Sequence, residues 1–218
     1  MSESFVDNEQ PPGDPAEALR MIEEQRAAAV RQIYVDDRWW FWPWGFAWSV
    51  GFGLIFLRFG PGGQVFVDLP DWLPTAVLVA LILAAGVISG LTGARAYGHI
   101  AGESAKRGAY YGWAWMITFT AMTVILVRIS DRLPADLQIV VWSATMVGLT
   151  GALHLAGGAI WLNRQLFLLG AWISVVNVAG VLAGPGWQAL IMCVAGGGGM
   201  LVFGLVASRW HRRGRRHD

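Results

Sequence analysis

The sequence has few of the features on which enzyme chemistry usually depends. Its 218 residues include one cysteine, which excludes a disulfide framework and any cysteine-built metal or iron–sulfur site within one chain. It contains no phosphate-binding GxxxxGK[ST] loop, no GxSxG nucleophile elbow and no HExxH zinc motif. Charged residues make up 14% of the chain, against roughly 25% in soluble domains. These absences exclude an ordinary soluble domain and weigh against an enzyme.

Long uncharged stretches take the place of these features, and they predict membrane-spanning helices. Five stretches lack Asp, Glu, Lys and Arg, and they cover residues 39–57, 72–94, 108–127, 137–163 and 165–208. A spanning helix needs about 20 mostly apolar residues, so the first four stretches hold one helix each. The fifth has 44 residues and holds two, separated by a tight turn at Gly184-Pro185-Gly186. We therefore expect an all-α polytopic membrane protein with six spanning helices, at 42–58, 74–93, 111–128, 138–162, 165–183 and 187–207.

Lys and Arg lie mostly on one side of these expected helices. Only Arg58, Arg128 and Arg132 of the 16 basic residues fall on the opposite side. We expect the protein in the inner (plasma) membrane of the cell. The positive-inside rule then places both of its termini on the cytoplasmic side. The first 40 residues lack the basic start and apolar core of a cleavable signal peptide, so we expect the first spanning helix to direct insertion.

The chain is expected to have three parts: a cytoplasmic N-terminal segment (1–38), the helical bundle (39–208) and a basic cytoplasmic tail (209–218). After a polar tip (1–13), Asp14, Pro15 and Glu17 are typical of a helix start, and the apolar residues that follow fall on roughly one face. This amphipathic helix, 14–35, has several interpretations. It docks a partner protein, lies along the inner leaflet, packs beneath the bundle, or pairs with its copy in a homo-oligomer.

Aromatic and basic clusters mark the two ends of the bundle. The run from Trp39 to Trp44 is typical of a belt at the membrane interface, where the indole ring has one apolar and one wet side. The tail is expected to contact anionic lipid headgroups through Arg209, Arg212, Arg213, Arg215 and Arg216. A stop-transfer anchor after a spanning helix accounts for these charges, so no nucleic-acid partner is expected.

An internal repeat links the spanning helices. Residues 90–94 (GLTGA) recur 58 residues later as 148–152, and a looser copy lies at 204–207. The odd-numbered helices also resemble one another, with Trp44-Gly45-Phe46-Ala47-Trp48 similar to 111–115. This pattern predicts three parallel helical hairpins, although a short match in Gly-rich helices also arises by chance. Parallel repeats of this kind surround a central axis in some transporters.

Glycines are expected to bring helix backbones together. Gly86 with Gly90, and Gly180 with Gly184, have the small-xxx-small spacing of close helix contacts. The run 196–199 consists of four glycines, Gly196, Gly197, Gly198 and Gly199. It indicates either very tight packing or a locally unwound segment, and the sequence does not decide between them.

Few polar groups lie inside the expected spans, and these are the candidate functional residues. No Asp, Glu or Lys is among them, which leaves His154 and Asn177 as candidate binding groups. His154 either relays protons or binds a substrate, or it is a neutral side chain satisfied by a neighbour. Asn177 is equally explained by an interhelical hydrogen bond. We expect no catalytic residue, no metal and no cofactor.

The order of these features resembles a known kind of protein. A helix with Glu17-Ala18-Leu19 and Glu23-Glu24-Gln25-Arg26 precedes the Trp44-Gly45-Phe46-Ala47-Trp48 segment and six Gly/Ala-rich spans. In that order the chain is similar to uncharacterised six-helix integral membrane proteins of GC-rich bacteria. The resemblance implies no activity and no catalytic residue.

Three functions remain open. The first is a non-enzymatic membrane component that assembles with itself or with a partner protein. The second is a channel or facilitator for a small solute, with a path between the three hairpins. The third is a membrane-embedded enzyme that acts on a lipid or apolar substrate.

Overall fold

The computed structural model describes residues 14–33, 38–97 and 102–214, and within these ranges it is helical with no strand. The chain divides into two units, with the boundary after Val35. The first unit contains a single helix, α1 (Pro15–Ile33). The Asp14 side chain accepts a hydrogen bond from the Ala16 amide at 3.1 Å, which confirms the expected start of this helix. The expected tip at 1–13 lies outside the described residues, as does the end of the expected helix beyond Ile33.

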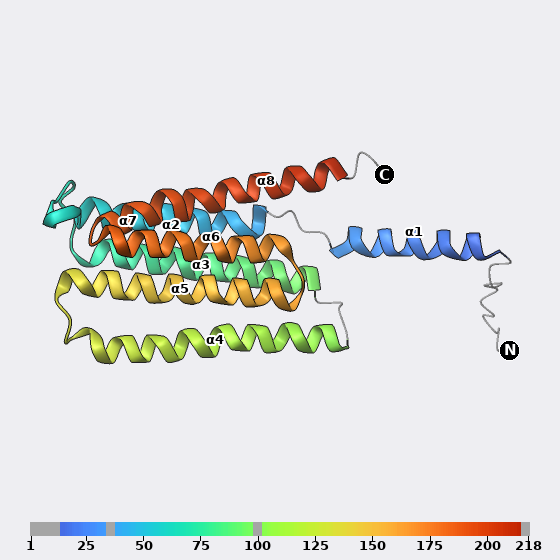
Figure 1. The fold of residues 1–218 in the computed structure, drawn as a ribbon, viewed down its shortest axis with the longest axis horizontal. Helices are drawn as coiled ribbons and strands as arrows, with labels where there is room; N and C mark the ends of the chain where they lie inside the picture. The colour runs from blue at the N-terminus through green and yellow to red at the C-terminus, as the bar shows by residue number, and fades with distance from the viewer. Residues whose placement is uncertain (1–13, 34–37, 98–101, 215–218) are drawn as a thin grey trace, which may run out of the picture. The chain divides into compact units, whose positions relative to one another are not determined.

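The second unit contains the six spanning helices, as the charge-free stretches predict (Figure 1). They are α2 (Arg38–Arg58), α3 (Trp72–Tyr97), α4 (Glu103–Ser130), α5 (Ala135–Ile160), α6 (Arg164–Ala183) and a sixth span in three segments. The sixth span consists of α7 (Trp187–Ile191), the π-helical turn η2 (Met192–Gly197) and α8 (Gly198–Gly214). A short 3₁₀ helix, η1 (Pro61–Gly63), lies in the α2–α3 connection. The protein is therefore an all-α polytopic membrane protein.

The helix ends differ from those expected. α2 begins at Arg38 and includes Pro43, and α8 continues through Arg209 to Gly214. Hydropathy detects only the part of a helix that hydrocarbon surrounds, whereas backbone hydrogen bonding continues into the polar interface. The first half of the expected basic tail is thus continuous with α8. Arg215 and Arg216 lie outside the described residues.

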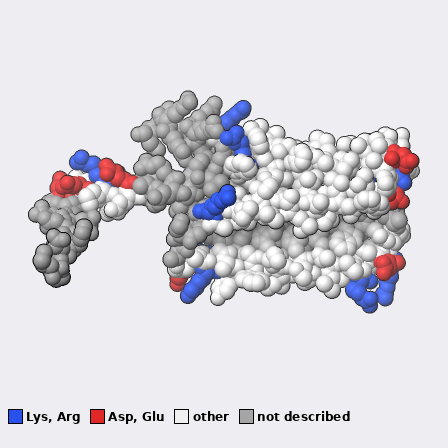
Figure 2. Space-filling model, turned by 180° about the vertical axis from the view of Figure 1, so that it is seen from behind, with Lys and Arg blue, Asp and Glu red and all other residues white. Residues whose placement is uncertain are grey.

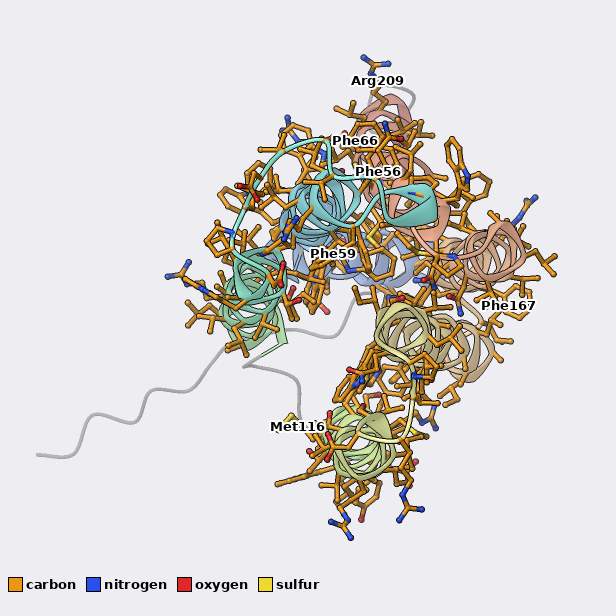
Figure 3. All side chains as sticks on the ribbon, turned by 90° about the vertical axis from the view of Figure 1, so that its left-hand side faces the viewer. Phe56, Phe59, Phe66, Met116, Phe167 and Arg209 are labelled. Carbon is orange, nitrogen blue, oxygen red and sulfur yellow. The ribbon has the colours of Figure 1, made fainter. Side chains whose placement is uncertain are left out.

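The six spans pack in the order α3, α2, sixth span, α6, α5 and α4, each against the next. Figure 3, which looks along the helices, shows α3 and α4 at the two ends of this row. The core lies in the middle of the row. Its buried side chains are Ala47, Trp48, Phe52 and Ile55 of α2, Val147 of α5, Leu169, Ile173 and Val176 of α6, and Ala189, Met192 and Met200 of the sixth span.

Charged side chains gather at the two ends of the six-helix unit and leave an uncharged band between them (Figure 2). At one end Arg58 forms an ion pair with Asp71, with 2.6 Å between Nη2 and Oδ1, and lies 3.9 Å from Asp68. The opposite end has more basic than acidic residues, including Lys106, Arg107, Arg164 and Arg209. The band matches the hydrocarbon of a bilayer. That the more basic end faces the cytoplasm stays a prediction.

Candidate functional site

His154 lies where α4 packs against α5. Its Nδ1 atom is 2.7 Å from the Thr150 carbonyl oxygen one turn earlier, a contact that places the ring proton on Nδ1. The imidazole ring stands edge-to-face against Trp115 of α4, with 5.2 Å between the ring centroids. Trp115 itself stacks on Phe119. His154 therefore has a backbone partner and an aromatic neighbour in a contact between helices.

Asn177 lies on a different contact, between α6 and α5. Its Nδ2 atom donates to the Ala144 carbonyl oxygen at 2.8 Å, which is the interhelical hydrogen bond that the sequence allows. Gly148 makes room for this amide, because a Cβ there would lie 3.2 Å from Nδ2. The side chain is 9% exposed, and its Oδ1 atom is buried with no hydrogen-bond partner in the described part of the chain.

Gln188 of α7, a second amide inside the uncharged stretches, is more deeply buried than Asn177. It is 2% exposed, and its Nε2 atom lies 3.5 Å from the Val140 carbonyl oxygen, one turn before Ala144. Asn177 and Gln188 therefore meet the same strip of α5, whereas His154 meets α4. The structure thus does not bring the two expected binding groups, His154 and Asn177, into one site. Gln188 was identifiable as a polar residue in an apolar stretch, but its burial depends on the turn that folds α7 back onto α6.

The glycine run in the sixth span overlaps the end of the π-helical turn η2, which includes Gly196 and Gly197, while Gly198 and Gly199 begin α8. A Cβ on Gly197 would clash with the Ser49 side chain and lie 2.7 Å from the Gly45 carbonyl oxygen, so the backbones of α2 and η2 are in close contact. Two carbonyl groups of this turn accept side-chain hydrogen bonds. Ser49 Oγ donates to Cys193 at 3.2 Å, and Trp172 Nε1 donates to Ala195 at 3.0 Å. Gly197 is thus tightly packed, and the backbone of η2 is a π-helical turn rather than an unwound segment.

Within the described chain, only one of the two small-xxx-small glycine pairs contacts another helix. Among the described residues, no atom lies within 4 Å of a Cβ built on Gly86 or Gly90, which are both exposed on α3. Gly180 does contact the sixth span, through Gln188, while Gly184 ends α6 with a φ of 85°. Spacing identifies a small-residue face, but it does not identify which helix covers that face.

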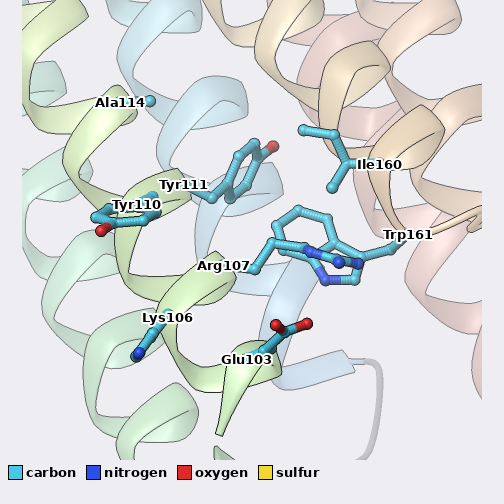
Figure 4. Close-up of a pocket in the computed structure, with 8 residues that line it drawn as sticks. All are labelled: Glu103, Lys106, Arg107, Tyr110, Tyr111, Ala114, Ile160 and Trp161. Carbon is cyan, nitrogen blue, oxygen red and sulfur yellow. The ribbon is translucent and has the colours of Figure 1, made fainter.

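Two hollows open sideways on the surface of the bundle. One, of about 480 Å³, lies between α4 and α5 (Figure 4) and is lined by Glu103, Lys106, Arg107, Tyr110, Tyr111, Ala114, Ile160 and Trp161. The other, of about 510 Å³, follows α6 and α8 and is lined by Trp172, Val194, Ala195, Gly198, Gly199, Val202, Phe203 and Val206. Neither is lined by His154 or Asn177. The first is the only one of the two with charged side chains.

Among the described residues, no group of three or more His, Cys, Asp and Glu side chains could hold a metal ion. Cys193 donates to the Ser49 carbonyl oxygen and has no thiol partner in the described chain. Comparison with known proteins finds no matching family model, no matching curated protein and no matching solved structure.

Proposed function

We propose that the protein is a non-enzymatic membrane component that assembles with a second copy of itself through the exposed face of α3. The observation that carries this proposal is the pair Gly86 and Gly90. They lie one turn apart and are exposed, with no atom of the described chain within 4 Å of a Cβ at either position, whereas α3 contacts α2 through residues such as Leu78 and Ser89.

The internal repeat allows the exposed strip of α3 to be compared with the equivalent strip of α5, which packs against another helix. Counting 58 residues forward from α3, Gly86 corresponds to Ala144 and Gly90 to Gly148. On α5 this strip lies directly against α6, since Ala144 accepts the Asn177 hydrogen bond and Gly148 approaches the same side chain. The equivalent strip of α3 has small residues at both corresponding positions, and no helix of the described six-helix unit lies on it. A helix from another protomer would fill the place that α6 fills on α5.

Membrane physics favours the same interpretation. Lipid tails are as apolar as Leu side chains, so helices associate through close packing rather than through a hydrophobic effect. Exposed glycines gain nothing from lipid, whereas glycines facing another helix allow a close backbone approach. The same face also carries exposed Leu83 and Val87, which supply contact surface beside the glycines.

The solute-path hypothesis has less support. A path would need polar groups that face an open passage, but the Asn177 amide is held against α5 by its hydrogen bond to Ala144. The two hollows open toward the surroundings of the bundle, away from Asn177. The enzyme hypothesis would need at least two polar groups that converge, and His154 and Asn177 lie on different helix contacts. Both hypotheses stay predictions.

The test is the stoichiometry of the full chain in a bilayer. Fluorescently labelled protein is reconstituted at decreasing density, and its subunits are counted by photobleaching steps. The wild-type chain is expected to give two steps, and the double variant Gly86→Ile/Gly90→Ile is expected to lower the association constant by about tenfold or more. A Cβ at either position meets no atom of the described chain within 4 Å, and both positions are exposed, so the fold should be unaffected.

The matched control is Ala152→Ile/Ala156→Ile, which places two isoleucines at the same spacing on exposed positions of α5. It should associate as the wild type does. Single-step bleaching of the wild type at all densities would overturn the proposal. Equal weakening by both double variants would also overturn it, because the effect would then not depend on the α3 face.

A further inference from the structure

We infer that the hollow between α4 and α5 binds the headgroup of an anionic phospholipid, with the lipid phosphate against Arg107. The hollow has a volume of about 480 Å³ and is open rather than enclosed. It lies between two spanning helices, so a lipid in the membrane plane can reach it. This inference is independent of the proposed assembly, which concerns α3.

The walls of the hollow combine charge and aromatic surface. Figure 4 shows Glu103 and Arg107 of α4 on the side that faces Ile160 and Trp161 at the end of α5. Tyr111 forms the upper part of this wall, and its ring stands edge-to-face to Trp161 with 4.7 Å between the centroids. Tyr111 is fixed there because its hydroxyl donates to the Leu153 carbonyl oxygen at 2.5 Å. The aromatic surface is thus preformed.

The hollow lies at the level of the spanning helices where a lipid headgroup is expected. Trp161 directly follows the apolar part of α5, which ends at Ile160, and Lys106 and Arg107 lie in the first turns of α4. Tyr and Trp are enriched at this level of a bilayer, and basic pockets between spanning helices on the cytoplasmic side bind acidic headgroups. The Ile160 side chain and the aromatic rings are placed to contact the first carbons of the acyl chains.

The charges select an anion. Lys106 and Arg107 against Glu103 leave one net positive charge on the lining. All three residues are exposed, and in the described part of the chain no ion pair joins them. A phosphodiester monoanion satisfies the guanidinium group of Arg107, which favours phosphate geometry. Glu103 repels the same anion, so its removal should strengthen binding.

The experiment uses the full chain in detergent and counts bound lipids by native mass spectrometry. Dioleoylphosphatidylglycerol is the anionic probe and dioleoylphosphatidylcholine, with the same acyl chains, is the neutral one. Arg107→Ala is expected to lower the affinity for phosphatidylglycerol about fivefold, and Glu103→Gln is expected to raise it severalfold. Phosphatidylcholine has the same phosphodiester but no net charge, so its binding should change by clearly less than that of phosphatidylglycerol in both variants.

The control variant is Arg128→Ala, which removes the same charge from the opposite end of α4 and should leave phosphatidylglycerol binding unchanged. Equal losses in Arg107→Ala and Arg128→Ala would overturn the inference, because net charge alone would then explain them. A second arm adds inorganic phosphate at millimolar concentration as a competitor. No displacement is expected of a lipid held also by its chains, and full displacement would instead identify a site for small soluble anions.

Discussion

Ser49 of α2 and Cys193 of η2 bond each other reciprocally across the core. The Ser49 hydroxyl donates to the Cys193 carbonyl oxygen at 3.2 Å, and the Cys193 thiol donates to the Ser49 carbonyl oxygen at 3.1 Å. The Cys193 carbonyl also accepts the Gly198 amide five residues later, which is the hydrogen bond of a π-helix. The thiol of the single cysteine thus donates a hydrogen bond that joins the π-helical turn η2 to α2.

Cys193→Ser should therefore be tolerated, whereas Ser49→Ala should not. Serine keeps a donor at position 193, so the reciprocal pair survives. Alanine at position 49 removes one of the two bonds and should lower the free energy of unfolding by about 1 kcal/mol. Thermal unfolding in detergent, followed by tryptophan fluorescence, measures both. If Cys193→Ser proved the more damaging of the two, apolar packing of the thiol would be its main role.

Neighbouring glycines in the run 196–199 should respond differently to alanine. A Cβ on Gly197 clashes with Ser49, while one on Gly198 meets nothing within 4 Å. Overpacking typically costs about 1–3 kcal/mol, so Gly197→Ala should destabilise the protein by that amount and Gly198→Ala should be neutral or slightly stabilising. Each variant changes a single glycine of the same run, so their unfolding curves can be compared directly. Equal effects would contradict the close approach of α2 to η2.

The turn between α5 and α6 holds a leucine in a conformation that leucine rarely adopts. Leu162 has a φ of 50° and is 91% exposed, so the strain is not offset by burial. Leu162→Gly or Leu162→Asn should raise the free energy of unfolding by about 0.5–1 kcal/mol, because both residues tolerate the left-handed region. Leu162→Val should lower it, since a branched Cβ is disfavoured there. Unfolding in detergent measures the free energy of unfolding, which should be highest with Gly or Asn at position 162, intermediate with Leu and lowest with Val.

Two replacements of Asn177, by Leu and by Asp, distinguish a packing role of this side chain from a polar role. Its Oδ1 atom has no partner, so Asn177→Leu removes one hydrogen bond and one unsatisfied group together. The net change in stability should stay below about 1 kcal/mol. Asn177→Asp should cost about 2.5–3.5 kcal/mol, because a carboxylate at this depth is expensive. A large loss in Asn177→Leu would instead indicate that Oδ1 has a ligand or a water molecule in the membrane.

The number of spans and their approximate limits could be read from the sequence, because hydrocarbon excludes charge over a fixed thickness and each backbone must satisfy itself there. Polar residues inside a span were equally visible. Asn177 was identified, and its interhelical hydrogen bond was among the expected roles. What could not be read was the partner of each face, and Gly86 and Gly90 show why. The spacing of the glycines identifies a helix face that permits close contact, but it does not identify the helix that packs against that face.

The sequence by itself determined that this protein lies in a membrane as six helices, since length and hydropathy are properties of each segment alone. Only the tertiary structure decided that α3 and α4 lie at the ends of the row, that Gln188 is buried beside α5, and that Tyr111, Arg107 and Trp161 line one hollow. Those outcomes depend on contacts between segments far apart in the chain. Their energies arise from side-chain shape at each helix contact, which no single stretch of sequence contains.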